Sequence, residues 1–124
     1  MESTLDRLTG TTSLADAVAD AALVIEAVPE EMELKRETMR EVEGFADDDA
    51  VLATNTSSLS VTEILNALDR PGRGVGLHFF NPVHIMALVE VVVAEQTTAA
   101  TLEFAHEFVE EVEKTAVEVR DSPG

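Results

Sequence analysis

Two residues that together can perform acid–base chemistry lie near the middle of the sequence, His78 and Glu90. Glu90 is a carboxylate inside the apolar run 88–93, where an unpaired charge would be costly to bury. A carboxylate that orients an imidazole and stabilises its protonated form makes the histidine a useful general base near neutral pH. The pair therefore predicts a catalytic dyad. The alternative is that Glu90 points outward from a half-exposed strand and that His78 is an ordinary core histidine.

Further polar residues occur at or just after predicted strands, namely Glu30, the segment 55–58 and Asn81. The sequence Asn-Thr-Ser-Ser at 55–58 offers hydroxyl and amide groups that could bind a substrate. The same residue types favour turns and helix caps, so a purely structural role is the alternative. A nucleophilic serine is not expected, because the pattern G-x-S-x-G is missing.

The remaining glycine and histidine patterns predict no pyrophosphate site and no metal site. Glycines at 72, 74 and 76 lie before and at the start of a predicted strand, whereas a dinucleotide fingerprint follows a strand and opens a helix. We therefore expect a turn and a strand start here, and no pyrophosphate site. His84 and His106 have no metal-ligand spacing and are expected to be structural or surface residues. The sequence predicts no metal site, and the lack of cysteine excludes disulfides and thiolate ligands.

The elements that must position these residues alternate between strand and helix. Capping-box spacings at Ser13 and Ser60 predict two helix starts. The segment 32–46 is amphipathic, with Met39, Val42 and Phe45 on its inner stripe beside Lys35. Strands are expected at 23–28, 51–55, 74–80, 88–93 and 116–119, and helices from 13, over 32–46, from 60 to about 70 and over 98–115.

This order predicts an α/β fold: an incomplete Rossmann-like, mostly parallel sheet with flanking helices. In open α/β sheets, ligands bind outside the carboxyl ends of the strands. We therefore expect the polar residues at those ends to converge on one site.

Composition narrows the class of protein. The chain has 124 residues, enough for one domain, with 25 acidic and 8 basic residues and a formal net charge of −17. This negative charge repels a phosphate backbone, so nucleic acid is not expected as a partner. Only two residues are lysine, Lys35 and Lys114, and an acidic, lysine-poor surface suits a high-salt cytoplasm, so we expect a halophilic source. No signal segment or apolar run of ~18 residues is present, which predicts a cytoplasmic protein without a membrane span.

The chain contains four segments in a characteristic order: VIEAVPE at 24–30, NTSS at 55–58, HFFNPVHIM at 78–86 and LVEVV at 88–92. Together they resemble the 3-hydroxyacyl-CoA dehydrogenase family, which includes 3-hydroxybutyryl-CoA dehydrogenases. The resemblance spans nearly the whole chain and implies oxidation of a (3S)-hydroxyacyl-CoA with NAD as cofactor, in fatty-acid metabolism.

The resemblance also implies roles for individual residues. His78 is expected to be the general base for the substrate 3-hydroxyl and Glu90 to orient it. Ser57 and Asn81 are expected to bind the reacting oxygen or its neighbours.

Three more residues, Glu30, Lys35 and Asn55, are expected near the nicotinamide and its ribose. The partner that the family implies is thus an acyl-CoA substrate.

Family members differ from this sequence at both ends. They open with a strand, a G-x-G-x-x-G loop and a helix, none of which precedes Thr12, and they continue after the segment 121–124 into a helical domain. We expect residues 1–124 to be the second part of an NAD-binding domain. The alternative is a truncated or split-gene fragment without independent catalysis that folds or acts only with a partner chain. The expected protein partner is a complementary chain or a second copy in a homo-oligomer.

Overall fold

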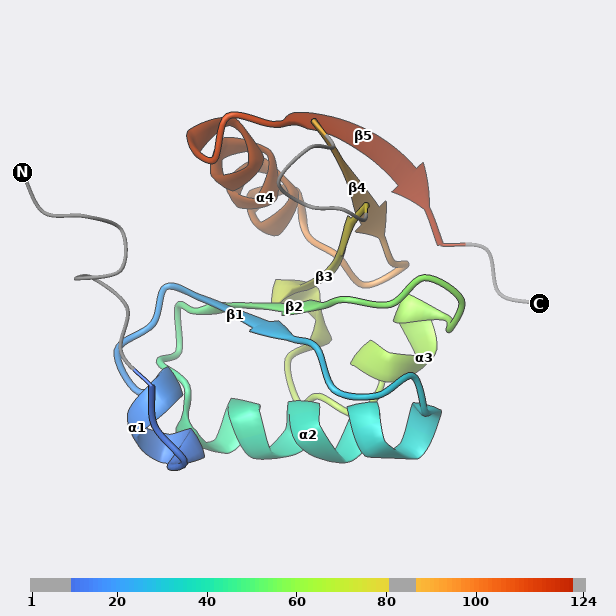
Figure 1. Ribbon diagram of the computed structural model, residues 1–124. Helices are drawn as coiled ribbons and strands as arrows, with labels where there is room; N and C mark the ends of the chain where they lie inside the picture. The colour runs from blue at the N-terminus through green and yellow to red at the C-terminus, as the bar shows by residue number, and fades with distance from the viewer. Residues whose placement is uncertain (1–9, 81–86, 122–124) are drawn as a thin grey trace, which may run out of the picture.

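The computed structural model describes residues 10–80 and 87–121. They form one sheet with the spatial order β1-β2-β3-β4-β5 and helices on both faces (Figure 1). The strands are β1 Leu23–Glu26, β2 Val51–Thr54, β3 Gly74–Phe79, β4 Leu88–Val93 and β5 Thr115–Arg120. The helices are α1 Leu14–Val18, α2 Met32–Phe45, α3 Val61–Leu65 and α4 Ala99–Glu111, with a 3₁₀ turn, η2, at Pro71–Arg73.

The sheet is mostly parallel, as predicted. β1 pairs with β2, β2 with β3 and β4 with β5 in parallel, whereas β3 and β4 run antiparallel. In the antiparallel pair His78 lies directly opposite Glu90. The carboxyl ends of β1, β2 and β3 consequently meet at one edge of the sheet, with Glu90 beside the third of them.

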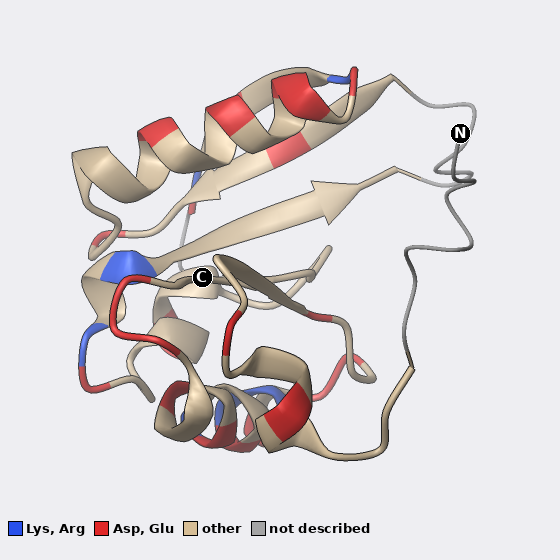
Figure 2. Cartoon of the chain, turned by 90° about the vertical axis from the view of Figure 1, so that its left-hand side faces the viewer, with Lys and Arg blue, Asp and Glu red and all other residues tan. Residues whose placement is uncertain are grey.

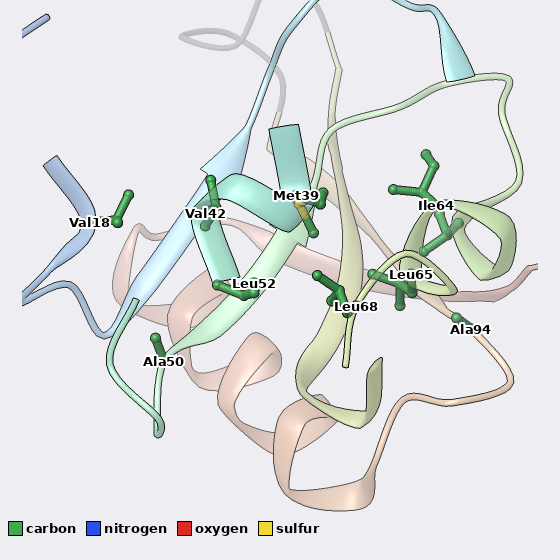
Figure 3. Packing of buried hydrophobic residues seen from close by; sticks show 10 residues of the cluster. Val18, Met39, Val42, Ala50, Leu52, Ile64, Leu65, Leu68 and Ala94 are labelled. Atoms are coloured by element: carbon green, nitrogen blue, oxygen red, sulfur yellow. The ribbon is translucent and has the colours of Figure 1, made fainter. Parts of the chain in front are cut away.

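Two apolar layers hold the helices to the sheet, and the alternation of side chains along each strand divides them. Leu52 of β2 faces α2 and α3 and belongs to one cluster with Met39, Val42 and Ile64, all at most 2% exposed (Figure 3). Val51 and Ala53, its neighbours in sequence, belong to the opposite layer beneath α4. α2 and α4 therefore cover opposite faces of the sheet (Figure 1).

Helix starts follow local hydrogen-bond chemistry. The predicted caps Ser13 and Ser60 accept hydrogen bonds from the amides of Asp16 and Glu63. The cap of α2 is Glu31, whose carboxylate accepts from the amides of Glu33 and Leu34. This satisfies amides that the first helical turn leaves without a partner.

The three glycines before and within β3 make close packing possible, consistent with the predicted turn and strand start. A Cβ on Gly74 would lie 2.4 Å from Leu65 Cδ2, and one on Gly76 would lie 2.8 Å from Val92 Cβ. The strand can therefore approach α3 and β4 only because these positions lack side chains.

Some boundaries and one inner position differ from the predictions. β1 ends at Glu26, α3 ends at Leu65 and α4 ends at Glu111, each earlier than expected. Phe45, predicted on the inner stripe of α2, is 50% exposed because it is the last residue of the helix and the chain turns away at Ala46.

Most acidic residues lie on helices and turns, and few lie on the strands (Figure 2). Among the described residues, no helix has the length and apolar character needed to cross a bilayer.

Candidate functional site

A pocket of about 280 Å³ opens at the carboxyl ends of β1, β2 and β3. It is lined by Ala27, Val28, Glu30, Asn55, Ser57, His78 and Phe79. Four of the residues predicted from the sequence, Glu30, Asn55, Ser57 and His78, are thus brought together in one place. Their convergence matches the general position of ligand sites in open α/β sheets.

His78 and Glu90 make a direct contact at this edge. His78 Nδ1 lies 2.9 Å from Glu90 Oε1, and the two side chains are 21% and 32% exposed. A carboxylate can only accept, so Nδ1 carries the proton in this contact and Nε2 is left as an acceptor. The ring of Phe80 packs against the imidazole with centroids 5.1 Å apart. The arrangement holds the imidazole in place, and within residues 10–80 and 87–121 its Nε2 atom has no hydrogen-bond partner.

A second pocket, of about 210 Å³, lies next to the first, and Ser57 lines both. Its wall includes Ser58, Glu90, Val92 and Asp121. Asp121 accepts hydrogen bonds from Ser60 Oγ and the Thr62 amide at 2.9 and 2.7 Å, which ties the end of β5 to the start of α3. Burial would raise the pKa of Asp121, but these hydrogen bonds outweigh it and lower the pKa.

Glu30 organises the loop that follows β2. Its Oε2 atom accepts from the hydroxyls of Thr56, Ser57 and Ser58 at 2.8, 3.3 and 3.1 Å, and from the amides of Ser57 and Ser58 at 3.0 and 3.2 Å. Burial would raise the pKa of Glu30, but these hydrogen bonds outweigh it and lower the pKa to about 2. The pocket therefore contains a carboxylate that is ionised at any physiological pH.

Lys35 lies behind the pocket rather than in its wall. Its side chain is fully buried, and Nζ lies 2.6 Å from Glu26 Oε2 and 3.5 Å from Glu30 Oε1. It also donates to the backbone oxygens of Val28 and Asn55, both at 3.1 Å. Lys35 thus contacts three residues of the pocket wall, Val28, Glu30 and Asn55, without lining the pocket itself.

The sequence predictions missed Glu26, which is the counter-ion of Lys35 and is 4% exposed. The signal was present, because Glu26 is a carboxylate within the apolar run 23–28, just as Glu90 is within 88–93. His106 falls outside the site, because it pairs with Glu118 at 3.0 Å on the surface. Asn81 and His84 lie outside the described residues.

The pocket fits one end of a nicotinamide dinucleotide. Its carboxylate, amide and hydroxyl groups are suited to hydrogen bonds with ribose hydroxyls and a carboxamide. In residues 10–80 and 87–121, by contrast, no glycine-rich turn follows a strand and opens a helix, which is the usual cradle for a pyrophosphate. The described residues thus offer groups of the kind that bind a ribose and a carboxamide, and no cradle for a pyrophosphate.

The sheet order, the strand-end pocket and the His–Glu pair define part of a Rossmann-type dehydrogenase domain. Comparison with known proteins gives the family. The profile of "3-hydroxyacyl-CoA dehydrogenase, NAD binding domain" matches residues 1–122, and the chain belongs to this family. NAD is accordingly the family's cofactor.

Individual relatives agree with this assignment. The chain is 40% identical to a 3-hydroxybutyryl-CoA dehydrogenase of Clostridioides difficile over 97% of its own length and 42% of the relative's. It is 43% identical to a fatty acid oxidation complex subunit alpha of Idiomarina loihiensis, over 91% of the chain and 16% of that relative. The crystal structure of (S)-3-hydroxybutyryl-CoA dehydrogenase from Ralstonia eutropha superposes with a TM-score of 0.92 at 36% identity, covering 97% of this chain and 42% of that one. The chain therefore spans less than half the length of these relatives.

Proposed function

We propose that the chain supplies the nicotinamide side of an active site that oxidises a (3S)-hydroxyacyl-CoA to the 3-oxoacyl-CoA. The observation that supports this most directly is the His78–Glu90 contact of 2.9 Å beside a pocket that presents Glu30, Asn55 and Ser57. Bound NAD would supply the acceptor for the hydride that leaves C3 of the substrate. The chain's own residues would handle the proton and the positioning.

In this proposal His78 Nε2 takes the proton of the 3-hydroxyl group as hydride leaves the same carbon. Glu90 fixes the Nδ1–H tautomer and stabilises the imidazolium that results, and a positioned base of this kind contributes about 10²–10⁴ in rate. Ser57, which lines both pockets, would hydrogen-bond the reacting oxygen or its neighbours together with Asn81.

The cofactor side of the proposal rests on Glu30 and Asn55. Both line the first pocket and offer groups that can bind ribose hydroxyls. Lys35 would act through them, because its ammonium is buried against Glu26. NAD binding would then perturb Asn55, Ser57 and His78 more than the residues of α4.

The test measures NADH consumption with acetoacetyl-CoA in molar salt, with the Clostridioides difficile relative as a positive control. Turnover by this chain that His78→Ala removes, while His106→Ala does not, supports the role given to His78. Full activity of His78→Ala would refute that role. NAD titration followed by NMR at the amides of Asn55 and Ser57 tests the cofactor site without turnover.

A second proposal is that the chain acts only with a complementary polypeptide. It is favoured by the absence of a glycine-rich strand-to-helix turn from the described residues. Such a partner would have to supply a cradle for the pyrophosphate and the remainder of an acyl-CoA pocket. Turnover that appears only when a polypeptide with a G-x-G-x-x-G turn is added would support it, and turnover by the chain alone would exclude it.

The acidic surface and the lack of cysteine also fit a reducing, salt-rich cytoplasm, which is the location we propose.

A further inference from the structure

Two carboxylates face a single buried ammonium beneath the pocket. Lys35 Nζ is 2.6 Å from Glu26 Oε2 and 3.5 Å from Glu30 Oε1. The side chains of Lys35 and Glu26 are fully buried, while that of Glu30 is 34% exposed. Glu26, in the core, and Glu30, in the pocket wall, therefore both lie close to the same ammonium.

The three N–H groups of the ammonium show which carboxylate accepts a hydrogen bond from Lys35. A lysine ammonium has three donors, and those of Lys35 go to Glu26 Oε2, the Val28 oxygen and the Asn55 oxygen. No donor is left for Glu30 in this geometry. Glu30 Oε2 instead receives all its hydrogen bonds from the loop at Thr56, Ser57 and Ser58.

Glu26 is held firmly in its place. Its Oε1 atom accepts from Thr54 Oγ1 at 2.5 Å, and Oε2 accepts from the Val28 amide at 2.8 Å as well as from Lys35. These partners come from the segment just after β1, from β2 and from α2, so the carboxylate is held from three sides. The lysine therefore stays with Glu26.

We propose that Glu26 is a positioning residue for the active site, because it keeps the Lys35 ammonium engaged and leaves Glu30 free to hold the Ser57 loop. The inference rests on the proposed function, since Ser57 and Glu30 face the reacting groups there. Glu26 itself touches neither pocket: the walls of both are made by other residues.

Removal of the charge at position 26 has a specific consequence. In Glu26→Gln the buried ammonium loses its carboxylate, and an uncompensated buried charge is strongly unfavourable. Glu30 is the nearest remaining anion, at 3.5 Å. It should rotate toward Lys35 and give up its hydrogen bonds to the amides of Ser57 and Ser58, although residue 26 contacts neither serine.

The experiment follows the amide proton chemical shifts of Ser57 and Ser58 in the full chain at neutral pH. We expect both to lose their downfield, carboxylate-bonded shifts in Glu26→Gln. They should recover in the double variant Glu26→Gln/Lys35→Met, because no cation then draws Glu30 away. Val42→Ala, which destabilises the core on the same helix without touching the pocket, should leave both shifts unchanged.

Unchanged Ser57 and Ser58 shifts in Glu26→Gln would overturn the proposal. It would also be overturned if the Ser57 and Ser58 shifts of the double variant were no closer to the native values than those of Glu26→Gln. Should Glu26→Gln not fold, Glu26→Asp decides. Its shorter carboxylate draws the ammonium away from the Asn55 oxygen, so the Asn55 and Ser57 resonances should move; native shifts would overturn the proposal.

NAD titration of the same variants separates this inference from the proposed function. A native chain that binds NAD, with weaker binding in Glu26→Gln and recovery in the double variant, supports both. A native chain that does not bind NAD counts against the proposed cofactor site, while the ligand-free shifts of Ser57 and Ser58 still decide the role of Glu26.

Discussion

His78 and Glu90 occupy directly opposed positions on the antiparallel strands β3 and β4, and their side chains meet at 2.9 Å. Residues directly opposite each other on neighbouring strands have side chains that lie close together. The pair is thus fixed by the register of the sheet. An imidazole held in this way has its tautomer set by the carboxylate.

The first prediction concerns that tautomer. In Glu90→Gln the amide can serve as donor or acceptor, so the preference for Nδ1–H should be lost and the two neutral tautomers of His78 should become mixed. Nitrogen-15 chemical shifts of the imidazole measure this directly. Glu118→Gln is the matched control, because Glu118 contacts His106 Nε2 at 3.0 Å and should alter His106 alone. An unchanged His78 in Glu90→Gln would contradict the role given to Glu90.

The sequence predicted the order of strands and helices because each is encoded locally. The caps at Ser13 and Ser60 and the apolar runs of the strands need only neighbouring residues to form. The four predicted residues of the first pocket followed from strand-end positions. What the local pattern lacked was the pairing direction of β4, which is a property of the folded sheet and places Glu90 opposite His78.

Buried charge was the harder feature to predict. Lys35 lies on the same stripe of α2 as Met39, and its inward position was visible in the periodicity. Its partner Glu26 comes from another element, so their contact appears only when α2 packs on β1 and β2. The prediction for Phe45 was wrong. Its periodicity placed it on the inner face, but the helix ends there and leaves it half exposed.

The second prediction concerns the glycine at position 76. A Cβ there would lie 2.8 Å from Val92 Cβ and 2.9 Å from Val61 Cγ2, so Gly76→Ala should lower the free energy of unfolding by about 1–3 kcal/mol. Gly44 is the control, because nothing lies within 4 Å of a Cβ at that position in α2. Gly44→Ala should stabilise by about 0.4–1 kcal/mol. Urea unfolding compares both, and equal effects would show that close packing at Gly76 does not matter.

The third prediction concerns acid sensitivity. The pKa of Glu30 is lowered from 4.5 to about 2 in the folded chain, so its ionised form stabilises the fold above the unfolded value. That contribution should be present above about pH 5 and should disappear as the pH falls through 4.5 toward 2. The difference in unfolding free energy between the native chain and Glu30→Gln should follow this course. Glu103→Gln, on the exposed face of α4, should show no such dependence.

The fourth prediction concerns salt. The formal charge of −17 repels itself in dilute buffer, and this repulsion is screened when the Debye length shortens from about 10 Å at 0.1 M salt to about 3 Å at 1 M. Most acidic residues lie on helices and turns, where such screening acts (Figure 2). We therefore expect the melting temperature to rise steadily with KCl up to molar concentrations. Sucrose, which stabilises proteins without screening charge, is the control. Full stability in dilute buffer, with no further gain from KCl, would argue against adaptation to a salt-rich cytoplasm.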